Sequence, residues 1–175
     1  MVYKPNVCRK ILEKFIRNEL NTIMNNKYMQ LAIETARLGI KSNMGGPFGA
    51  VIVRNGEVIA TAHCEGIGTN DPTAHAEIVA IRRATAKIKQ FYLSDCEIYC
   101  TCEPCPMCLS AIYWADIKSL YFGANRHDAA AEGFDDEIVY KLVAGTVDNP
   151  LLHPVVIDQK ECAELFNEWK VRVKH

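Results

Sequence analysis

Four side chains in two short segments have the types and the spacing of an open zinc site. His75 stands two positions before Glu77, and Cys105 stands three positions before Cys108. Imidazole and thiolate are preferred zinc ligands, and three protein ligands leave a fourth position for water. Because a structural zinc site fills all four positions, the pattern predicts a catalytic zinc held by His75, Cys105 and Cys108. Glu77 would then remain free as a proton carrier beside the metal.

Two helix starts are expected to position these side chains. Thr73 is predicted to cap a helix over residues 74–87, which places His75 and Glu77 in its first turn. A second helix over 105–114 places the cysteine pair at its own N-terminus. The partial positive charge at a helix N-terminus favours thiolate over thiol, which suits a zinc ligand.

The remaining elements follow from hydrophobic periodicity and from turn residues. Asn55-Gly56 predicts a two-residue hairpin turn between two strands. Strands are expected over residues 48–53, 57–62, 96–100, 119–122 and 154–157, and further helices over 8–20, 28–40, 137–143 and 162–171. The predicted fold class is α/β, a three-layer α-β-α sandwich with a central mixed five-stranded sheet and helices on both faces. We expect an N-terminal helical extension over residues 1–26 and a catalytic domain over 27–175.

Composition indicates a single folded domain. The chain has 175 residues, of which 49% are hydrophobic and 23% are charged, which fills one core and is too little for two. No apolar run approaches the ~20 residues that span a bilayer, and the first residues lack a signal-peptide pattern. Residues 1–27 carry a basic excess in a chain of net charge −1. A solvated helix face explains that excess better than nucleic-acid binding does.

The eight cysteines allow three interpretations. Four disulfides would suit a small secreted chain, and Cys105-x-x-Cys108 alone would suit a thioredoxin-like redox role. The lack of a secretion signal and the crowding of Cys102 with the other two cysteines favour reduced thiols and metal. A redox role would also have no use for His75 and Glu77. We therefore expect a cytoplasmic protein with reduced thiols.

The same motifs carry a resemblance to a known family. His-Ala-Glu, followed thirty residues after the histidine by Pro-Cys-x-x-Cys, is similar to the signature of the zinc-dependent cytidine deaminase superfamily. Four segments together resemble its guanine deaminase branch, and the resemblance covers roughly residues 28–170. These segments are Gly46–Val53, Asn70–Glu77, Cys102–Leu109 and Gly133–Asp136. The resemblance implies a cytidine deaminase-like fold and one Zn²⁺ in each subunit.

The chemistry expected of such a site is hydrolytic deamination. Zinc lowers the pKa of its bound water toward neutrality. Glu77 is predicted to accept a proton from this water as it attacks an amidine-like carbon, and to carry protons to a ring nitrogen and to the departing amine. Backbone N–H groups near Ala76 and Cys105 are expected to stabilise charge on the oxygen. The reaction replaces an exocyclic amino group by a carbonyl and releases ammonia.

The resemblance implies substrate contacts for three further side chains. Phe48 is expected to form an aromatic wall against the base, and Trp114 to line the pocket. Asp136 is expected to recognise a purine edge that bears an amino group and an N–H, because a carboxylate accepts from both donors. Plain core packing is the alternative for Phe48 and Trp114. Capping of the following helix by Asp135 or Asp136 is the alternative for Asp136.

Two features depart from the family pattern. Cys64 stands eleven positions before His75, where the superfamily commonly has an Asn whose amide contacts the substrate. A thiol is a weak donor and acceptor, so either base binding differs around Cys64 or the substrate is not guanine. The family resemblance also implies a homodimer whose C-terminal segment reaches across to close the partner's site. Here that tail is short and ends at His175, which either closes the site or frays.

The favoured reaction is therefore guanine to xanthine plus ammonia, and several alternatives stay open. Guanosine, a pterin or an amino-triazine presents a similar amidine. A tRNA adenosine deaminase would need a positively charged surface, which the acidic balance outside residues 1–27 disfavours. Membrane and nucleic-acid partners are not expected. A noncatalytic zinc-stabilised interaction domain would have no use for Glu77.

Overall fold

The computed structural model describes residues 26–148 and 153–173. They divide into two compact units, of which the first ends at Tyr140 and the second begins at Lys141. The expected helix over residues 8–20 and the chain end at His175 lie outside the described residues. The division into an extension over 1–26 and a catalytic domain thus stays a prediction.

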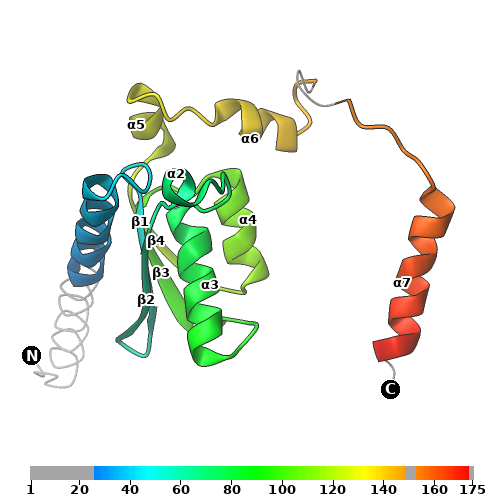
Figure 1. Ribbon diagram of the computed structural model, residues 1–175, viewed down its shortest axis with the longest axis horizontal. Coiled ribbons are helices and arrows are strands. Elements are labelled where there is room, and N and C mark those ends of the chain that lie inside the picture. Colours follow the sequence, from blue (N-terminus) through cyan, green and yellow to red (C-terminus); the bar gives the residue numbers. More distant parts are fainter. Residues whose placement is uncertain (1–25, 149–152, 174–175) are drawn as a thin grey trace, which may run out of the picture. The chain divides into compact units, whose positions relative to one another are not determined.

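The first unit is built on a mixed sheet of four strands (Figure 1). Their spatial order is β2 (Glu57–His63), β1 (Gly49–Arg54), β3 (Cys96–Cys102) and β4 (Ser119–Ala124). β1 runs antiparallel to both of its neighbours, and β3 runs parallel to β4. The β1–β2 turn is the one predicted, since Asn55 and Gly56 have positive φ angles of 51° and 80°. Two positive φ angles are the requirement of a tight hairpin turn that matches the twist of its strands.

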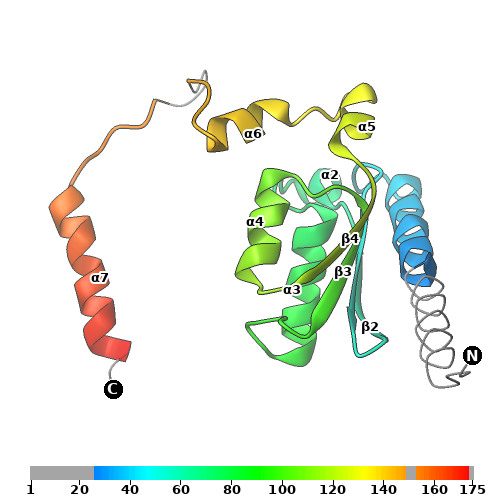
Figure 2. The same ribbon diagram turned by 180° about the vertical axis from the view of Figure 1, so that it is seen from behind.

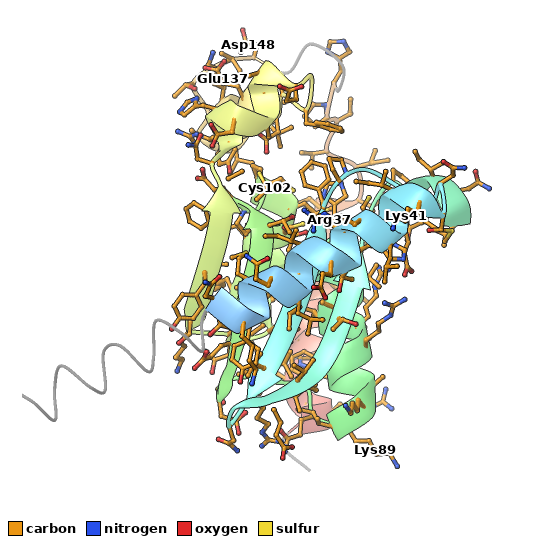
Figure 3. All side chains as sticks on the ribbon, turned by 90° about the vertical axis from the view of Figure 1, so that its left-hand side faces the viewer. Arg37, Lys41, Lys89, Cys102, Glu137 and Asp148 are labelled. Atoms are coloured by element: carbon orange, nitrogen blue, oxygen red, sulfur yellow. The ribbon has the colours of Figure 1, made fainter. Side chains whose placement is uncertain are left out.

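Helices cover both faces of this sheet, as Figures 1 and 2 show. A helix over residues 26–41 lies on one face, and α3 (Ala76–Ile88) and α4 (Pro106–Trp114) lie on the other. Arg37 and Lys41 are exposed on the first of these helices (Figure 3). The described residues therefore confirm a sandwich of three layers with a mixed sheet between helices.

Alternation along β1 gives each layer its own core. Ala50 and Ile52 are fully buried in the cluster that α3 and α4 share with the sheet. Val51 and Val53 are buried in a second cluster with Tyr28 of the helix over residues 26–41. Successive strand residues point to opposite faces, so one strand supports both layers.

Two short helices were not predicted. α2 (Gly66–Thr69) is a single turn inside the expected loop, and α5 (Arg126–Ala131) follows β4. The sequence does encode α5, because Asn125 accepts from the backbone N–H groups of His127 and Asp128 while the Asp128 carboxylate accepts from the Asn125 N–H. This reciprocal capping box stabilises a helix too short to show a hydrophobic period. The predicted helix over 137–143 is present as α6 (Glu137–Val143).

The predicted fifth strand is wrong. Residues 153–157 form no strand, although Val155, Val156 and Ile157 suggested one. A strand needs a partner edge for its N–H and C=O groups, and β-branched residues alone do not supply it. The last helix, α7 (Gln159–Val173), starts earlier than predicted. No helix among the described residues combines the length and the apolar character that a membrane crossing requires.

Candidate active site

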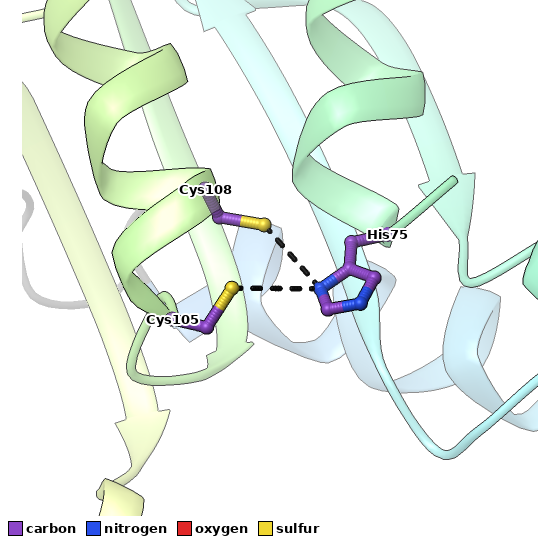
Figure 4. A group of neighbouring side chains, drawn as sticks. All are labelled: His75, Cys105 and Cys108. Atoms are coloured by element: carbon purple, nitrogen blue, oxygen red, sulfur yellow. Dashed lines mark hydrogen bonds between the residues drawn. The ribbon is translucent and has the colours of Figure 1, made fainter. Parts of the chain in front are cut away.

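Three potential metal ligands meet between the starts of α3 and α4 (Figure 4). The Nδ1 atom of His75 lies 3.6 Å from the Sγ of Cys105 and 3.5 Å from the Sγ of Cys108. His75 immediately precedes α3, Cys105 immediately precedes α4, and Cys108 lies in the first turn of α4. The sequence prediction that these three side chains form one group is therefore matched by their placement.

The spacing of these atoms fits a tetrahedral zinc ion. Zinc binds sulfur at about 2.3 Å and nitrogen at about 2.0–2.1 Å, which separates N from S by about 3.6 Å at a tetrahedral angle. The two observed N–S distances, 3.6 and 3.5 Å, agree with that value. Thiolate and imidazole are also the donors that zinc prefers. The three side chains could hold zinc without rearrangement.

The local structure at the start of α3 differs from the prediction in one detail. His75 itself, not Thr73, is the N-cap residue of α3. The Thr73 hydroxyl donates to the Asp71 carboxylate at 2.6 Å, and the same oxygen accepts from the Thr73 N–H at 2.8 Å. Thr73 is thus engaged in a turn before the helix and does not cap it. This turn fixes the approach of the chain to His75.

Glu77 lies beside the metal ligands and is deeply buried. Its side chain is in the first turn of α3, the residue is 7% exposed, and Oε2 lies 3.5 Å from the Cys108 Sγ. Burial raises the pKa of the Glu77 carboxyl above its usual value. A carboxylate in water-poor surroundings binds a proton more readily, which a proton carrier must do.

Hydrogen bonding prepares one of the two thiols for a metal. The Cys108 thiol donates to Cys105, which lowers the pKa of Cys105 to about 4, and His75 contributes in the same direction. The same hydrogen bond with Cys105 raises the pKa of Cys108, and burial of Cys108 raises it further. The pKa of His75 is raised mainly by its bond with Cys105. These hydrogen bonds therefore favour the thiolate form of Cys105, which is the form that binds a metal.

A pocket of about 360 Å³ opens onto this group. Predicted residues that line it are Phe48, Cys64, His75, Glu77, Cys105 and Asp136. Ala76 and Cys105, whose N–H groups were predicted to stabilise developing charge, lie at the starts of α3 and α4. The first N–H groups of a helix have no partner within the helix itself, which leaves them available to a ligand. The roles of all these residues remain predictions.

An aromatic pair forms one wall of the pocket. The rings of Phe48 and Phe134 meet edge to face, with their centroids 5.1 Å apart at an interplanar angle of 87°. Gly46 leaves room for this pair, since a Cβ there would lie 3.1 Å from the Phe48 ring. Because the two rings are perpendicular, the pair forms an apolar corner in which the face of one ring can contact a planar ligand.

Asp136 provides a second carboxyl group in the same pocket. Burial and the nearby Cys105 raise its pKa from its usual value, while Arg126 acts in the opposite direction. Asp135 holds the capping role that was the alternative for this pair, because its Oδ1 accepts from the Glu137 N–H at 2.9 Å. The Asp136 carboxylate is thereby left to face the pocket.

Trp114 does not line this pocket. It is the last residue of α4, is 74% exposed and borders a separate hollow with Phe91. The reason is the length of α4, since nine residues at 1.5 Å each place Trp114 roughly 13 Å from Cys105 along the axis. The helix that brings the cysteines to the site carries Trp114 away from it.

Eight residues of the pocket were not predicted as site residues. They are Gly46, Cys102, Glu103, Arg126, Ala129, Gly133, Phe134 and Asp135. Phe134 belongs to the quoted Gly-Phe-Asp-Asp segment, so the signal was present in the sequence. Cys102 and Glu103 likewise belong to the quoted Cys102–Leu109 segment. Arg126 had no such signal, because nothing local indicates that α5 folds back toward the segment before Cys105.

Comparison with known proteins agrees with this arrangement. A family profile described as the cytidine and deoxycytidylate deaminase zinc-binding region matches residues 23–124. A guanine deaminase of Bacillus subtilis is 40% identical over 148 residues, which are 84% of this chain and 95% of that protein. The crystal structure of a B. subtilis guanine deaminase has a TM-score of 0.77 and covers 83% of this chain and 92% of its own. A tRNA-specific adenosine deaminase of Aquifex aeolicus is 45% identical over 135 residues, covering 74% of this chain and 83% of that protein.

Proposed function

The chain belongs to the zinc-binding family of cytidine and deoxycytidylate deaminases, and on this premise we propose that it converts guanine and water to xanthine and ammonia. The family and the metal-ligand group make it a zinc-dependent hydrolytic deaminase. The choice of guanine is supported above all by Asp136, which faces the same pocket as Glu77 and the metal ligands. The 40% identity to a guanine deaminase across most of the chain supports the same choice.

The proposed reaction assigns each pocket residue a task. His75, Cys105 and Cys108 would hold zinc, which, when bound, supplies Lewis acidity and lowers the pKa of water. Glu77 takes one proton from the attacking water and gives it to a ring nitrogen. It then takes the second proton from the same oxygen, now bonded to the ring carbon, and gives it to the leaving amine. Phe48 and Phe134 hold the flat base, and the Asp136 carboxylate accepts hydrogen bonds from its amino and N–H groups. The buried position of Glu77 keeps bulk water from competing for the proton.

A tRNA substrate is the second candidate, favoured by the 45% identity to a tRNA-specific adenosine deaminase. The pocket residues argue against it. Besides Glu77, three carboxylates line the pocket, Glu103, Asp135 and Asp136, with Arg126 as the one Arg or Lys side chain among the lining residues. A phosphate backbone approaching this entrance would meet like charge, which opposes binding.

The function is tested by ammonia release from the purified, zinc-loaded protein. The panel contains guanine, guanosine, adenine, cytosine, cytidine, a pterin, an amino-triazine and a tRNA anticodon stem-loop with adenosine. We expect guanine to yield xanthine and one ammonia, with kcat/KM at least about 100-fold above that for adenine. Activity on the stem-loop or another base without activity on guanine would contradict the proposal.

The same assay has an Asp136→Asn arm. Loss of one charged acceptor costs about 1.5–3 kcal/mol, which corresponds to a fall of roughly 10- to 100-fold in kcat/KM for guanine. The matched control is Asp135→Asn, whose carboxylate caps α6. It is expected to lower thermal stability slightly and to leave the preference among bases unchanged. If both variants lost the preference for guanine equally, Asp136 would have a structural role at the start of α6 and no specific role in substrate recognition.

We further propose that the protein is a homodimer in which the C-terminal segment of each chain closes the partner's site. In the first unit, α4 exposes Leu109, Tyr113 and Trp114, and Tyr113 is 79% exposed. In the second unit, α7 exposes Leu165, Phe166, Val171 and Trp169. Large contiguous apolar surfaces of this kind mark protein interfaces.

Complementation tests the exchange. Sedimentation equilibrium should give twice the chain mass of 19.6 kDa. A chain that lacks residues 153–175 and a full-length Glu77→Gln chain should each be inactive. A mixture of the two chains, allowed to re-associate, should recover activity. In the heterodimer, the shortened chain supplies an intact Glu77 and the full-length variant supplies the C-terminal segment that closes that site. Full activity of the shortened chain alone would contradict the closing role, and dimers that never recover activity would contradict the exchange.

A cytoplasmic location is proposed on the state of the thiols. All seven cysteines among the described residues are free, and two of them are zinc-ligand candidates that must stay reduced. A reducing compartment meets this requirement. Recovery of the native protein from a non-reducing compartment in cell fractionation would contradict it.

A further inference from the structure

The loop that carries Phe134 and Asp136 is a short connection between two short helices. It follows α5, turns at Gly133 with a φ of 89°, and leads into α6. On the α5 side, the Phe134 N–H donates to the Ala129 carbonyl at 3.0 Å. Gly133 and Asp135 are exposed. Its own turn bonds shape this loop. Contacts with other segments set its distance from the metal ligands, and the ring contact of Phe134 with Phe48 is one of them.

Tyr140 makes such a contact. Its hydroxyl donates to the carbonyl of Pro104 at 3.1 Å, and Pro104 is a buried residue that immediately precedes Cys105. The guanidinium carbon of Arg126 lies 4.7 Å from the centre of the Tyr140 ring. The Arg126 backbone N–H in turn donates to Glu103 Oε2 at 3.1 Å. Both ends of the segment from α5 to α6 are thus bonded to the two residues before Cys105.

Tyr140 and Asp136 are related by one helical turn. The Tyr140 N–H donates to the Asp136 carbonyl at 3.3 Å, and residues four apart lie on the same face of a helix. A shift of Tyr140 along this helix would therefore move Asp136 by a similar amount. The hydrogen bond from Tyr140 to Pro104 is therefore one of the contacts that set the distance between Asp136 and Cys105.

We propose that Tyr140 is a positioning residue for substrate recognition, whose hydroxyl holds the Phe134–Asp136 loop at a fixed distance from the zinc-ligand loop. This inference rests on the proposed function, because it assigns Tyr140 a task that depends on Asp136 binding the base. The base must reach Asp136 with one edge while its amino-bearing carbon reaches the metal. Guanine binds well only where both distances are met at once, so a loosened spacing is expected to weaken its binding.

Tyr140→Phe tests the proposal, because it removes the hydroxyl and keeps the ring under Arg126. We expect a three- to tenfold rise in KM for guanine, kcat within twofold of the wild type, and zinc content still near one per chain. In the Glu77→Gln background, calorimetry should show a similar loss in guanine affinity without turnover. Tyr92→Phe is the matched control, since it removes an exposed tyrosine hydroxyl elsewhere on the chain. It should change none of these quantities.

A double-mutant cycle separates positioning from a general structural role. If Tyr140 acts through Asp136, then adding Tyr140→Phe to Asp136→Asn should lower kcat/KM by less than twofold. A further loss as large as that caused by Tyr140→Phe alone would overturn the inference, and so would an unchanged KM in the single variant. If the zinc-loaded Tyr140→Phe variant has a lower melting temperature and the wild-type KM, the hydroxyl contributes to stability alone.

The cycle also distinguishes this inference from the function on which it rests. The wild type is assayed first, on the base panel. If it acts on a base other than guanine, the guanine proposal fails and the cycle is run with that base. If it turns over guanine and the cycle is additive, only the positioning role fails.

Discussion

Replacement of Glu77 by Gln is expected to lower kcat by about 10²- to 10⁴-fold, the range that general acid–base catalysis supplies. Gln has the shape of Glu and cannot accept or return a proton at neutral pH. Glu77 is buried next to Cys108, so no neighbouring water would readily replace it. Zinc content should stay near one per chain, because the three other side chains form the ligand group.

The measurement is single-substrate kinetics together with metal analysis of the same preparation. Glu57→Gln is a suitable control, because Glu57 is an exposed carboxylate at the start of β2. It should keep wild-type kcat and zinc. If the Glu77→Gln protein lost its zinc, Glu77 would be a ligand and the proton-carrier assignment would be wrong. Retained activity would require another proton carrier in the pocket.

Loss of a zinc ligand should abolish activity and lower stability together. In Cys108→Ala we expect zinc to fall from about one per chain to near zero and deamination to fall below detection. A metal present at about 1,000 times its Kd stabilises the folded state by about 4 kcal/mol. For a domain of this size that corresponds to a melting temperature lower by on the order of 10 °C. Chelation of the wild type should have the same two effects.

Metal analysis, ammonia release and thermal unfolding check this prediction on one sample. Zinc added back should restore the chelated wild type and should leave Cys108→Ala inactive. Cys162→Ser is the control, since it removes an exposed thiol on α7 and should retain zinc and activity. A Cys108→Ala protein with full zinc would show that the ligand group is incomplete as described.

The metal-ligand group could be predicted because its information is local. His75 and Glu77 share one helix start, and Cys105 and Cys108 share another, so residue types at short spacing were enough. The strands of the first unit were predictable for a similar reason, because their apolar runs end at turn residues. The hairpin at Asn55-Gly56 is encoded in two residues alone.

The pocket could be predicted only in part, because it depends on approach between distant segments. Phe134 meets Phe48, and Tyr140 meets Pro104, only once α5 and α6 fold back over the segment before Cys105. Trp114 failed as a pocket residue because the direction of α4 matters as much as its start. Residues 154–157 failed as a strand because strand formation needs a partner edge, which residue preferences do not report.

The alternation of β1 between two cores has a consequence for how this chain can change during evolution. Ala50 and Ile52 support the layer that carries the metal ligands, and Val51 and Val53 support the opposite layer. Inserting or deleting one residue within β1 would exchange the two sets and misfit both cores at once. The same change in the exposed turn at Asn55-Gly56 would act on the pairing of β1 with β2, because the length of a hairpin loop sets its register. The length of β1 therefore matters for the placement of the metal ligands, although none of its side chains lines the pocket.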